Sequence, residues 1–216
     1  MGSIKRSFAN NLSTGGVFTS SAITNTSVTG ITTLANAPAD SITLISSQTA
    51  SASASISFTT GLDSTYKAYK FVFVNINPAS NNTDFQFNMS IDAGSNYNVT
   101  KTTTMFRAIH YESDASTALS YETGQDLAQS TAFQNIIEAI GNEADESASG
   151  SLLLFNPSST TYVKHFISNS NGYFGTDATF NYYSAGYGNT TSAVNALQFK
   201  MSSGNFDGTI YLYGIK

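Results

Sequence analysis

From residue 41 onward, hydrophobic and polar residues alternate in short runs, with turn-forming residues between the runs. The clearest run is residues 85–91 (FQFNMSI), whose apolar and polar positions alternate as in a strand with one buried face. In residues 66–76 (YKAYKFVFVNI), Phe71 and Phe73 share one face, while Val72 and Val74 share the other. A run that is apolar on both faces predicts a central strand.

The same pattern predicts about ten strands in all, separated by turn sequences such as PASNN and DAGSN. The other strands are expected at residues 41–44, 51–58, 102–111, 133–140, 152–155, 162–168, 174–183, 196–201 and 209–215. Residues 133–140 also fit a helix, but the acidic loop at 141–149 that follows favours a strand. Residues 113–129 stay ambiguous between loop and a helical turn near 126–129.

Many short strands with turn chemistry between them are typical of an all-β protein. We therefore expect an antiparallel β-sandwich, jelly-roll-like, over residues 41–216. In the closing run, Ile210 and Leu212 alternate with Tyr211 and Tyr213, which predicts a strand with the two aliphatic residues in the core. A final strand of this kind suits a closed sandwich.

Residues 1–40 differ from the rest of the chain, because they are rich in Ser, Thr, Asn and Gly and show no sustained period. Their hydrophobic residues are nevertheless spaced along the whole segment. We expect an extended N-terminal assembly arm that becomes ordered on a partner; the alternative is a floppy terminus. The partner-binding residues predicted in this arm are Ile4, Phe8, Val17, Phe18 and Ile23.

Composition narrows the function classes. The chain has 216 residues, no Cys, no Trp, two His and 11% charged residues. The lack of Cys excludes disulfides, thiol catalysis and Cys-type zinc sites. The net charge of -5 argues against nucleic acid as a partner. No run reaches transmembrane length and no secretory signal opens the chain, so we expect no membrane partner. The absence of Cys also fits assembly in a reducing cytoplasm.

Candidate catalytic and metal-binding residues are few. His110 and His165 lack the spacing of metal ligands, so ordinary strand histidines are the better interpretation. The acidic loop 143–146 lacks the ligand pattern of a calcium loop, which favours a solvated hairpin tip. The sequence holds no GxSxG motif and nothing in it pairs the carboxylates of Asp92, Asp126, Glu138 and Asp177. We expect no enzyme activity, no cofactor and no metal.

An aromatic segment near residue 180 offers a surface for sugar contact. Tyr182, Tyr183 and Tyr187 lie among Asn and Gly residues, and tyrosine rings can pack on the apolar faces of sugars. Half of these residues must face the core of any sandwich. Core packing together with subunit contact is therefore the competing interpretation.

Several segments carry a resemblance to a known group. Residues 3–11 (SIKRSFANN), 45–58, 66–75, 92–97 and 208–216 resemble structural proteins of tailed bacteriophages, notably marine ones. The resemblance covers most of the chain and implies a virion component: a capsid decoration protein, a tail fibre or an adaptor. It also implies other virion proteins as partners, a homo-oligomer, with a trimer as the favoured form, and a location in the virion after assembly in the host cytoplasm.

Together these observations predict a non-enzymatic virion structural protein that binds other virion proteins, in capsid decoration or a related assembly role. The alternative is a module of a tail fibre or tail tip that binds a host receptor or glycan. A third hypothesis is an enzyme that degrades polysaccharides.

Overall fold

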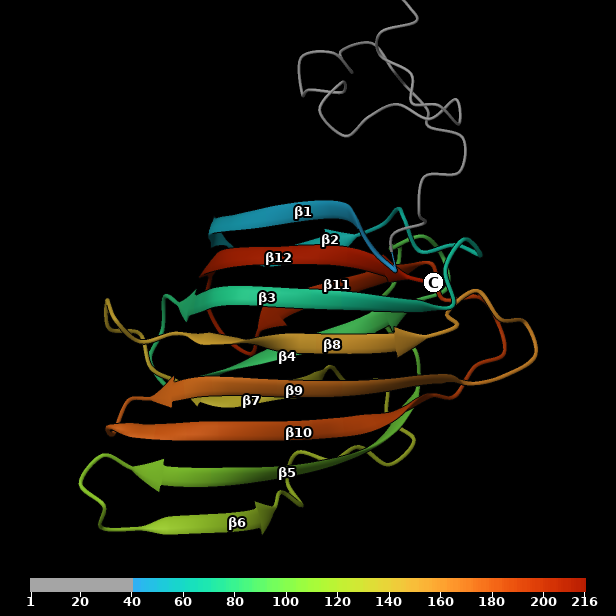
Figure 1. Cartoon of the computed structure of the whole chain (residues 1–216). Helices are drawn as coiled ribbons and strands as arrows, with labels where there is room; N and C mark the ends of the chain where they lie inside the picture. Colours follow the sequence, from blue (N-terminus) through green and yellow to red (C-terminus); the bar gives the residue numbers. More distant parts are fainter. Residues whose placement is uncertain (1–40) are drawn as a thin grey trace, which may run out of the picture. The chain divides into compact units, whose positions relative to one another are not determined.

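A computed structural model describes residues 41–216 as an all-β protein in which every strand pair is antiparallel (Figure 1). The strands are β1 (Ile42–Ser53), β2 (Ser55–Phe58), β3 (Ala68–Pro78), β4 (Thr83–Ser90), β5 (Lys101–Tyr111), β6 (Thr117–Tyr121), β7 (Gln134–Ile140), β8 (Ala148–Phe155), β9 (Lys164–Phe174), β10 (Ala178–Gly188), β11 (Ala196–Met201) and β12 (Phe206–Ile215). Residues 41–216 contain no helix, and so none that could cross a membrane.

The strands form one nearly closed, barrel-like sheet. Eight of them follow one another in the order β1-β12-β3-β8-β9-β10-β5-β6, which we call the eight-strand ladder. The other four follow in the order β7-β4-β11-β2, the four-strand ladder. A single bridge between Ile140 of β7 and Phe174 of β9 joins the two. In Figure 1 the eight-strand ladder lies in front and the four-strand ladder behind it.

Phenylalanine rings fill the space between the two ladders. Phe71 of β3 lies 5.3 Å from the ring of Phe58 and 5.3 Å from that of Phe199, both on the four-strand ladder. Phe73 contacts Phe85 of β4 at 5.4 Å. Phe71 and Phe73 are fully buried, and β3 pairs with β12 on one side and β8 on the other. The prediction of a central strand with its phenylalanines in the core is therefore confirmed.

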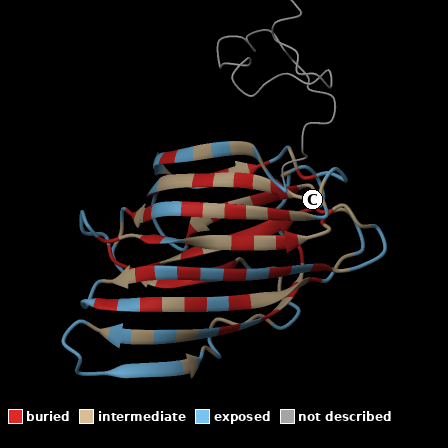
Figure 2. Ribbon diagram, in the orientation of Figure 1, coloured by how far each residue is buried: buried red, intermediate tan, exposed pale blue. Residues whose placement is uncertain are grey.

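The closing strand also behaves as predicted. β12 lies between β1 and β3, and both Ile210 and Leu212 have no exposed surface. Tyr211 and Tyr213 point to the other face, where their rings are 6.4 Å apart. Figure 2 shows the same two-sided pattern along the front strands, where buried residues alternate with exposed or half-buried ones.

The structure has twelve strands, against eleven expected segments, and several of the expected boundaries were wrong. Residues 42–58 form two nearly continuous strands that are separated by a bend at Ala54. Strand β6 lies inside the ambiguous stretch. The run SNSNG continues β9 where a turn was expected, because its inward residues are the small Ser168, Ser170 and Gly172 and give no hydrophobic signal.

Candidate binding surface

The outward side of the eight-strand ladder, which we call the outer face, carries most of the exposed apolar surface. Among residues 41–216, eight of the ten exposed large apolar side chains lie on it. They are Ile42, Leu44, Val74, Phe106, Leu119, Tyr121, Ile167 and Tyr183. A face on which exposed apolar side chains gather is a candidate interaction surface.

The outer face is also nearly free of charge. The eight strands hold five charged residues, and three of them, Lys101, Arg107 and Lys164, alternate in phase with the buried residues of their strands. The other two are Lys70 in β3 and Asp207 near the start of β12. A wide surface without charge loses little solvation free energy when a partner covers it.

A row of aromatic rings crosses three strands of this face. Tyr183 of β10 pairs with Phe106 of β5, which pairs with Tyr121 of β6. The rings of Phe106 and Tyr183 are stacked, with centroids 5.1 Å apart and planes at 12°. All three residues are 41–49% exposed, so part of each ring remains accessible to a ligand.

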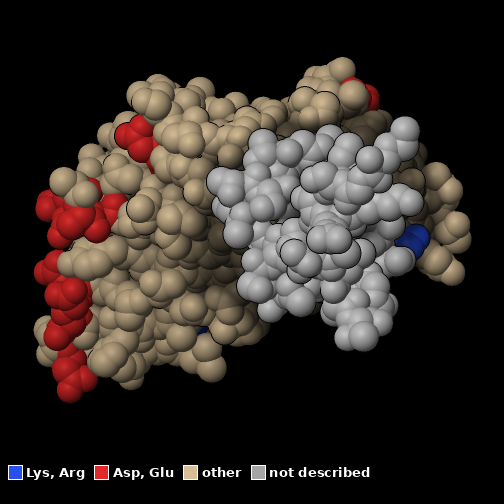
Figure 3. All heavy atoms as spheres, turned by 45° about the horizontal axis from the view of Figure 1, so that its top comes forward, with Lys and Arg blue, Asp and Glu red and all other residues tan. Residues whose placement is uncertain are grey.

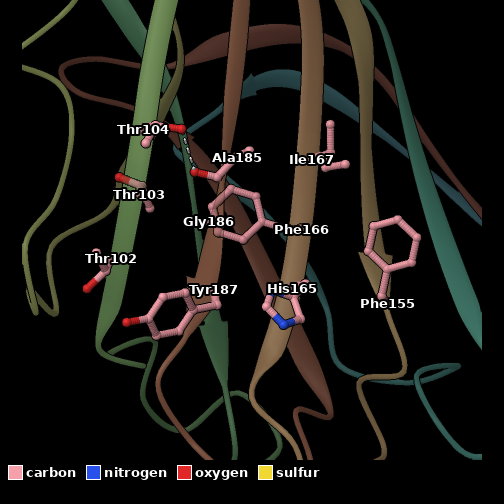
Figure 4. A pocket seen from close by; sticks show the side chains of 10 residues that line it. All are labelled: Thr102, Thr103, Thr104, Phe155, His165, Phe166, Ile167, Ala185, Gly186 and Tyr187. Carbon is pink, nitrogen blue, oxygen red and sulfur yellow. Dashed lines mark hydrogen bonds between the residues drawn. The ribbon is translucent and has the colours of Figure 1, made fainter.

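A shallow hollow of about 490 Å³ lies beside this row (Figure 4). It runs across β5, β10, β9 and the end of β8, and its outward-pointing lining is Thr102, Thr104, Phe155, His165, Ile167, Ala185 and Tyr187. Tyr187 and His165 are paired across neighbouring strands, with ring centroids 6.1 Å apart. None of the lining residues is Lys, Arg, Asp or Glu.

Two small residues of β10 create the hollow. Ala185 presents only a methyl group to the outer face, between the larger rings of Tyr183 and Tyr187. The next residue is Gly186, where β5 lies very close to the backbone of β10. A Cβ at this position would collide with the carbonyl oxygen of Thr102 and with Thr103. The segment SAGYG therefore places the small residue Ala185 beside the aromatic ring of Tyr187.

The three tyrosines proposed as a sugar-contact surface, Tyr182, Tyr183 and Tyr187, do not lie on the same face of the sheet. Tyr183 and Tyr187 lie on the outer face as expected for a surface contact. Tyr182 does not: it is fully buried, because neighbouring residues of a strand point to opposite faces. The surface position expected for Tyr182 is therefore corrected. The arm residues Ile4, Phe8, Val17, Phe18 and Ile23 lie outside the residues that the structure describes.

The inward side of β5 and β10 holds a partly buried polar cluster. Arg107 Nε lies 2.9 Å from Glu122 Oε1, and Arg107 Nη1 donates to Tyr182 Oη at 3.4 Å. Burial, reinforced by Asp84 and Glu122, raises the pKa of Glu138 to about 7. Burial also takes the pKa of Tyr182 well above its usual range. Sequence reasoning considered Glu138 as a carboxylate but missed Arg107 and Glu122, which lie far from it in the chain.

A carboxyl group that titrates near neutral pH can serve as a catalytic acid or base. Glu138, however, is only 9% exposed and points away from the outer face. A ligand in the hollow does not reach it. The geometry therefore assigns this cluster to the interior of the fold, where Arg107 also lies over the ring of Phe180 at 5.1 Å.

Acidic side chains gather at one end of the molecule, as the red edge in Figure 3 shows. The hairpin loops β5–β6, β7–β8 and β9–β10 contribute Glu112, Asp114, Glu143, Asp145 and Asp177. The first and third of these loops touch, because the Glu112 N–H donates to the Asp177 carbonyl at 2.9 Å. Asp177 accepts a hydrogen bond from Tyr173, and this raises the pKa of Tyr173 to about 12.

The acidic loop 143–146 is a solvated hairpin tip as expected, apart from its last residue: Glu143, Ala144 and Asp145 are exposed. Glu146 is 6% exposed, and its carboxylate accepts the Glu143 N–H at 2.8 Å, so that it caps its own loop. Asp114 instead lies 3.1 Å from Nε2 of His110 on an exposed surface. Within residues 41–216 no three acidic or histidine side chains are placed to share a metal ion.

Comparisons with known proteins give no family for the chain. No known family, no curated protein and no solved structure matches the sequence or the fold.

Proposed function

We propose that this chain is a non-enzymatic virion structural protein that binds other virion proteins, in capsid decoration or a related assembly role. The observation that carries the proposal is the nearly uncharged outer face, which holds eight of the ten exposed large apolar side chains of residues 41–216. A surface of this composition suits contact with another protein rather than solvent. The segment resemblance to phage structural proteins points in the same direction.

The strand order supports a jelly-roll sandwich as the fold behind this role. The order β1-β12-β3-β8 facing β2-β11-β4-β7 is the order expected when two Greek keys wind around one core. The hairpin partners β9-β10 and β5-β6 then extend one of the two sheets. Jelly rolls are found in viral capsid domains, lectins and cupins, so the fold is compatible with this role but does not select it.

Within the outer face, we assign the protein contact to the part formed by β1, β12 and β3. Ile42 and Leu44 of β1 are 54% and 53% exposed, next to Tyr213 of β12. The predicted arm, residues 1–40, directly precedes β1 in the chain. An arm and an adjacent apolar patch would together hold the protein on the particle or on further copies of itself, for which a trimer is our proposal.

The test is incorporation into particles assembled in the host cytoplasm. We expect an antibody against residues 41–216 to label purified virions, and deletion of residues 1–35 to leave the domain folded but to abolish labelling. Replacing Leu44 with Asp should lower incorporation at least tenfold, whereas Ile91→Asp, an exposed apolar residue outside the outer face, should not. Wild-type incorporation of both the deletion and Leu44→Asp would contradict the proposal.

A second candidate function is a host-receptor or glycan-binding module of a tail fibre or tail tip. The hollow beside the aromatic row favours it, because purely structural contacts do not require an open hollow. Copy number separates the two roles. Hundreds of labelled copies on the head indicate decoration, and a few at the tail indicate an adsorption apparatus.

A further inference from the structure

We infer that the hollow on β5, β10 and β9 is a binding site for a neutral polysaccharide, with Tyr187 as its principal stacking residue. This inference rests on the second candidate function and gives it a ligand class. The shape of the hollow, the rings around it and the charge of its lining each support it.

The shape fits an extended ligand. A volume of about 490 Å³ lies within the range of small-molecule sites, and the hollow is open along the outer face (Figure 4). Tyr183 and Tyr187 are four residues apart on β10, so their Cα atoms are roughly 13 Å apart. One sugar ring does not span this distance, whereas a chain of sugars can cross the floor at Ala185 and meet both rings.

The rings supply contacts that suit sugars. The face of an aromatic ring is weakly negative, and it attracts the weakly positive C–H groups on the apolar side of a pyranose. Tyr187 borders the hollow at one end, and the stacked pair Phe106 and Tyr183 follows beyond Ala185. Rings held by cross-strand pairing lose little conformational freedom when a ligand binds, because they are already packed against neighbours.

The polar groups of the lining are neutral hydrogen-bonding groups. Thr102 Oγ1 accepts from Gln129 Nε2 at 2.7 Å, which leaves its own hydroxyl proton for a ligand oxygen. Thr104 Oγ1 donates a hydrogen bond to the Ala185 carbonyl oxygen at 3.4 Å, so its lone pairs can still accept a hydrogen bond from a ligand hydroxyl. Sugar hydroxyls both donate and accept, so they match such groups.

The charge of the lining selects the ligand class. No Lys or Arg lines the hollow, so the one lining side chain able to pair with a phosphate, sulfate or carboxylate group is the imidazole of His165, and only when it carries a proton. Across the ladder, Lys70 of β3 is separated from the lining residue Ile167 by Leu153. The net charge of the chain, -5, repels polyanions further. Neutral glycans are therefore favoured over acidic ones.

The experiment is affinity electrophoresis of the full chain in native gels that contain a soluble polysaccharide. The neutral probes are a β-glucan, a mannan and a dextran, and the acidic probes are alginate and heparin. We expect at least one neutral probe to retard the wild-type protein and neither acidic probe to do so. Four variants identify the site: Tyr187→Ala, Tyr187→Phe, Ala185→Phe and Tyr211→Ala.

Tyr187→Ala should weaken binding at least tenfold, whereas Tyr187→Phe keeps the ring and should stay within about threefold. Ala185→Phe fills the hollow and should abolish retardation; phenylalanine is well accepted on a strand surface, so the fold should persist. Tyr211→Ala removes a ring from the same face outside the hollow and should change nothing. Circular dichroism confirms that each variant is folded.

Three results would overturn the inference: no retardation by any neutral probe, equal retardation of all variants, or retardation by the acidic probes alone. Release of reducing ends from a probe would instead indicate hydrolysis and would contradict a non-enzymatic site. Particle labelling is independent of this experiment. If the wild-type protein is incorporated into particles but binds no polysaccharide, the glycan site alone is rejected. If it binds a polysaccharide but is not incorporated, the assembly role alone is rejected.

Discussion

Glu138 Oε2 lies 3.8 Å from Arg107 Nη1 on the inward side of the sheet, but the two do not form a simple stable ion pair. Arg107 has a closer partner in Glu122, 2.9 Å from its Nε. Glu138 is therefore the second carboxylate beside one guanidinium, and its own side chain is only 10% exposed. Burial and the neighbouring carboxylates outweigh the attraction of Arg107, so the pKa of Glu138 rises to about 7.

Because the pKa of Glu138 is raised, the free energy of unfolding should depend on pH between about pH 4.5 and pH 7. The folded protein keeps a proton on Glu138 between pH 4.5, its ordinary pKa, and about pH 7, whereas the unfolded chain has released it. The free energy of unfolding should therefore fall as pH rises through this window, by on the order of 3 kcal/mol from this group. Glu138→Gln should remove that part of the slope.

Urea unfolding at pH 4.5, 5.5, 6.5 and 7.5 measures the effect as the difference between variant and wild type. Asp145→Asn, on an exposed hairpin tip, is the matched control and should leave the slope unchanged. An unchanged slope in Glu138→Gln would show that Glu138 is ionised throughout in the folded protein.

Lys101 should give the opposite trend in the alkaline range. Its side chain is fully buried, its Nζ donates to Val99 O at 2.9 Å, and burial lowers its pKa from 10.5 to about 7. Between pH 7 and 10.5 the unfolded chain binds a proton that the folded protein lacks, so stability should rise with pH. The gain between pH 7 and pH 9.5 is on the order of 3 kcal/mol.

Lys101→Met should abolish this rise, as measured by urea unfolding at pH 7, 8, 9 and 9.5. Lys67→Met, at an exposed position just before β3, should retain the wild-type slope. If Lys101→Met kept the wild-type slope, another group would be responsible for it.

Phe73 and Val74 test which side of β3 faces the core. Phe73 is fully buried against Phe85, whereas Val74 is 37% exposed on the outer face. Phe73→Ala should lower the free energy of unfolding by about 3–5 kcal/mol. Val74→Ala should cost less than about 1 kcal/mol, since much of its side chain is already in water. Similar losses in the two variants would contradict the assigned orientation.

Strand β12 should be indispensable for folding. It fills the place between β1 and β3, and its removal would expose the hydrogen-bonding edges of both neighbours. Deletion of residues 208–216 should therefore give insoluble protein on expression. Deletion of Lys216 alone, which lies beyond β12, should give soluble protein with a wild-type melting temperature. A soluble, cooperatively folding 208–216 deletion would refute the requirement.

The sequence predicted correctly those strands in which large apolar side chains alternate with other residues and are buried in the core. Phe71 and Phe73 of β3 and Ile210 and Leu212 of β12 repeat large apolar side chains at every second position, and all four are buried. The core of the structure follows directly from this period.

The parts that it could not predict depend on contacts across the ladder. Strand β6 (TALSY) is exposed and has one partner, so its sequence carries no buried stripe. The hollow needs Ala185 to lie beside Ile167 and Thr104, residues brought together only by the register of β9, β10 and β5. The assignment of Tyr182 to the inside and Tyr183 to the outside likewise depends on one residue of register.

The place of β12 between β1 and β3 has a consequence for synthesis on the ribosome. Strands β1 and β3 leave the ribosome early, yet the strand that joins them begins only at Phe206. At ordinary elongation rates, the wait is on the order of ten seconds. During that time the strand edges that will pair with β12 and the apolar side chains of β1 and β3 are exposed, which favours aggregation. The nascent chain is therefore expected to depend on chaperones or on a low local concentration of other nascent copies.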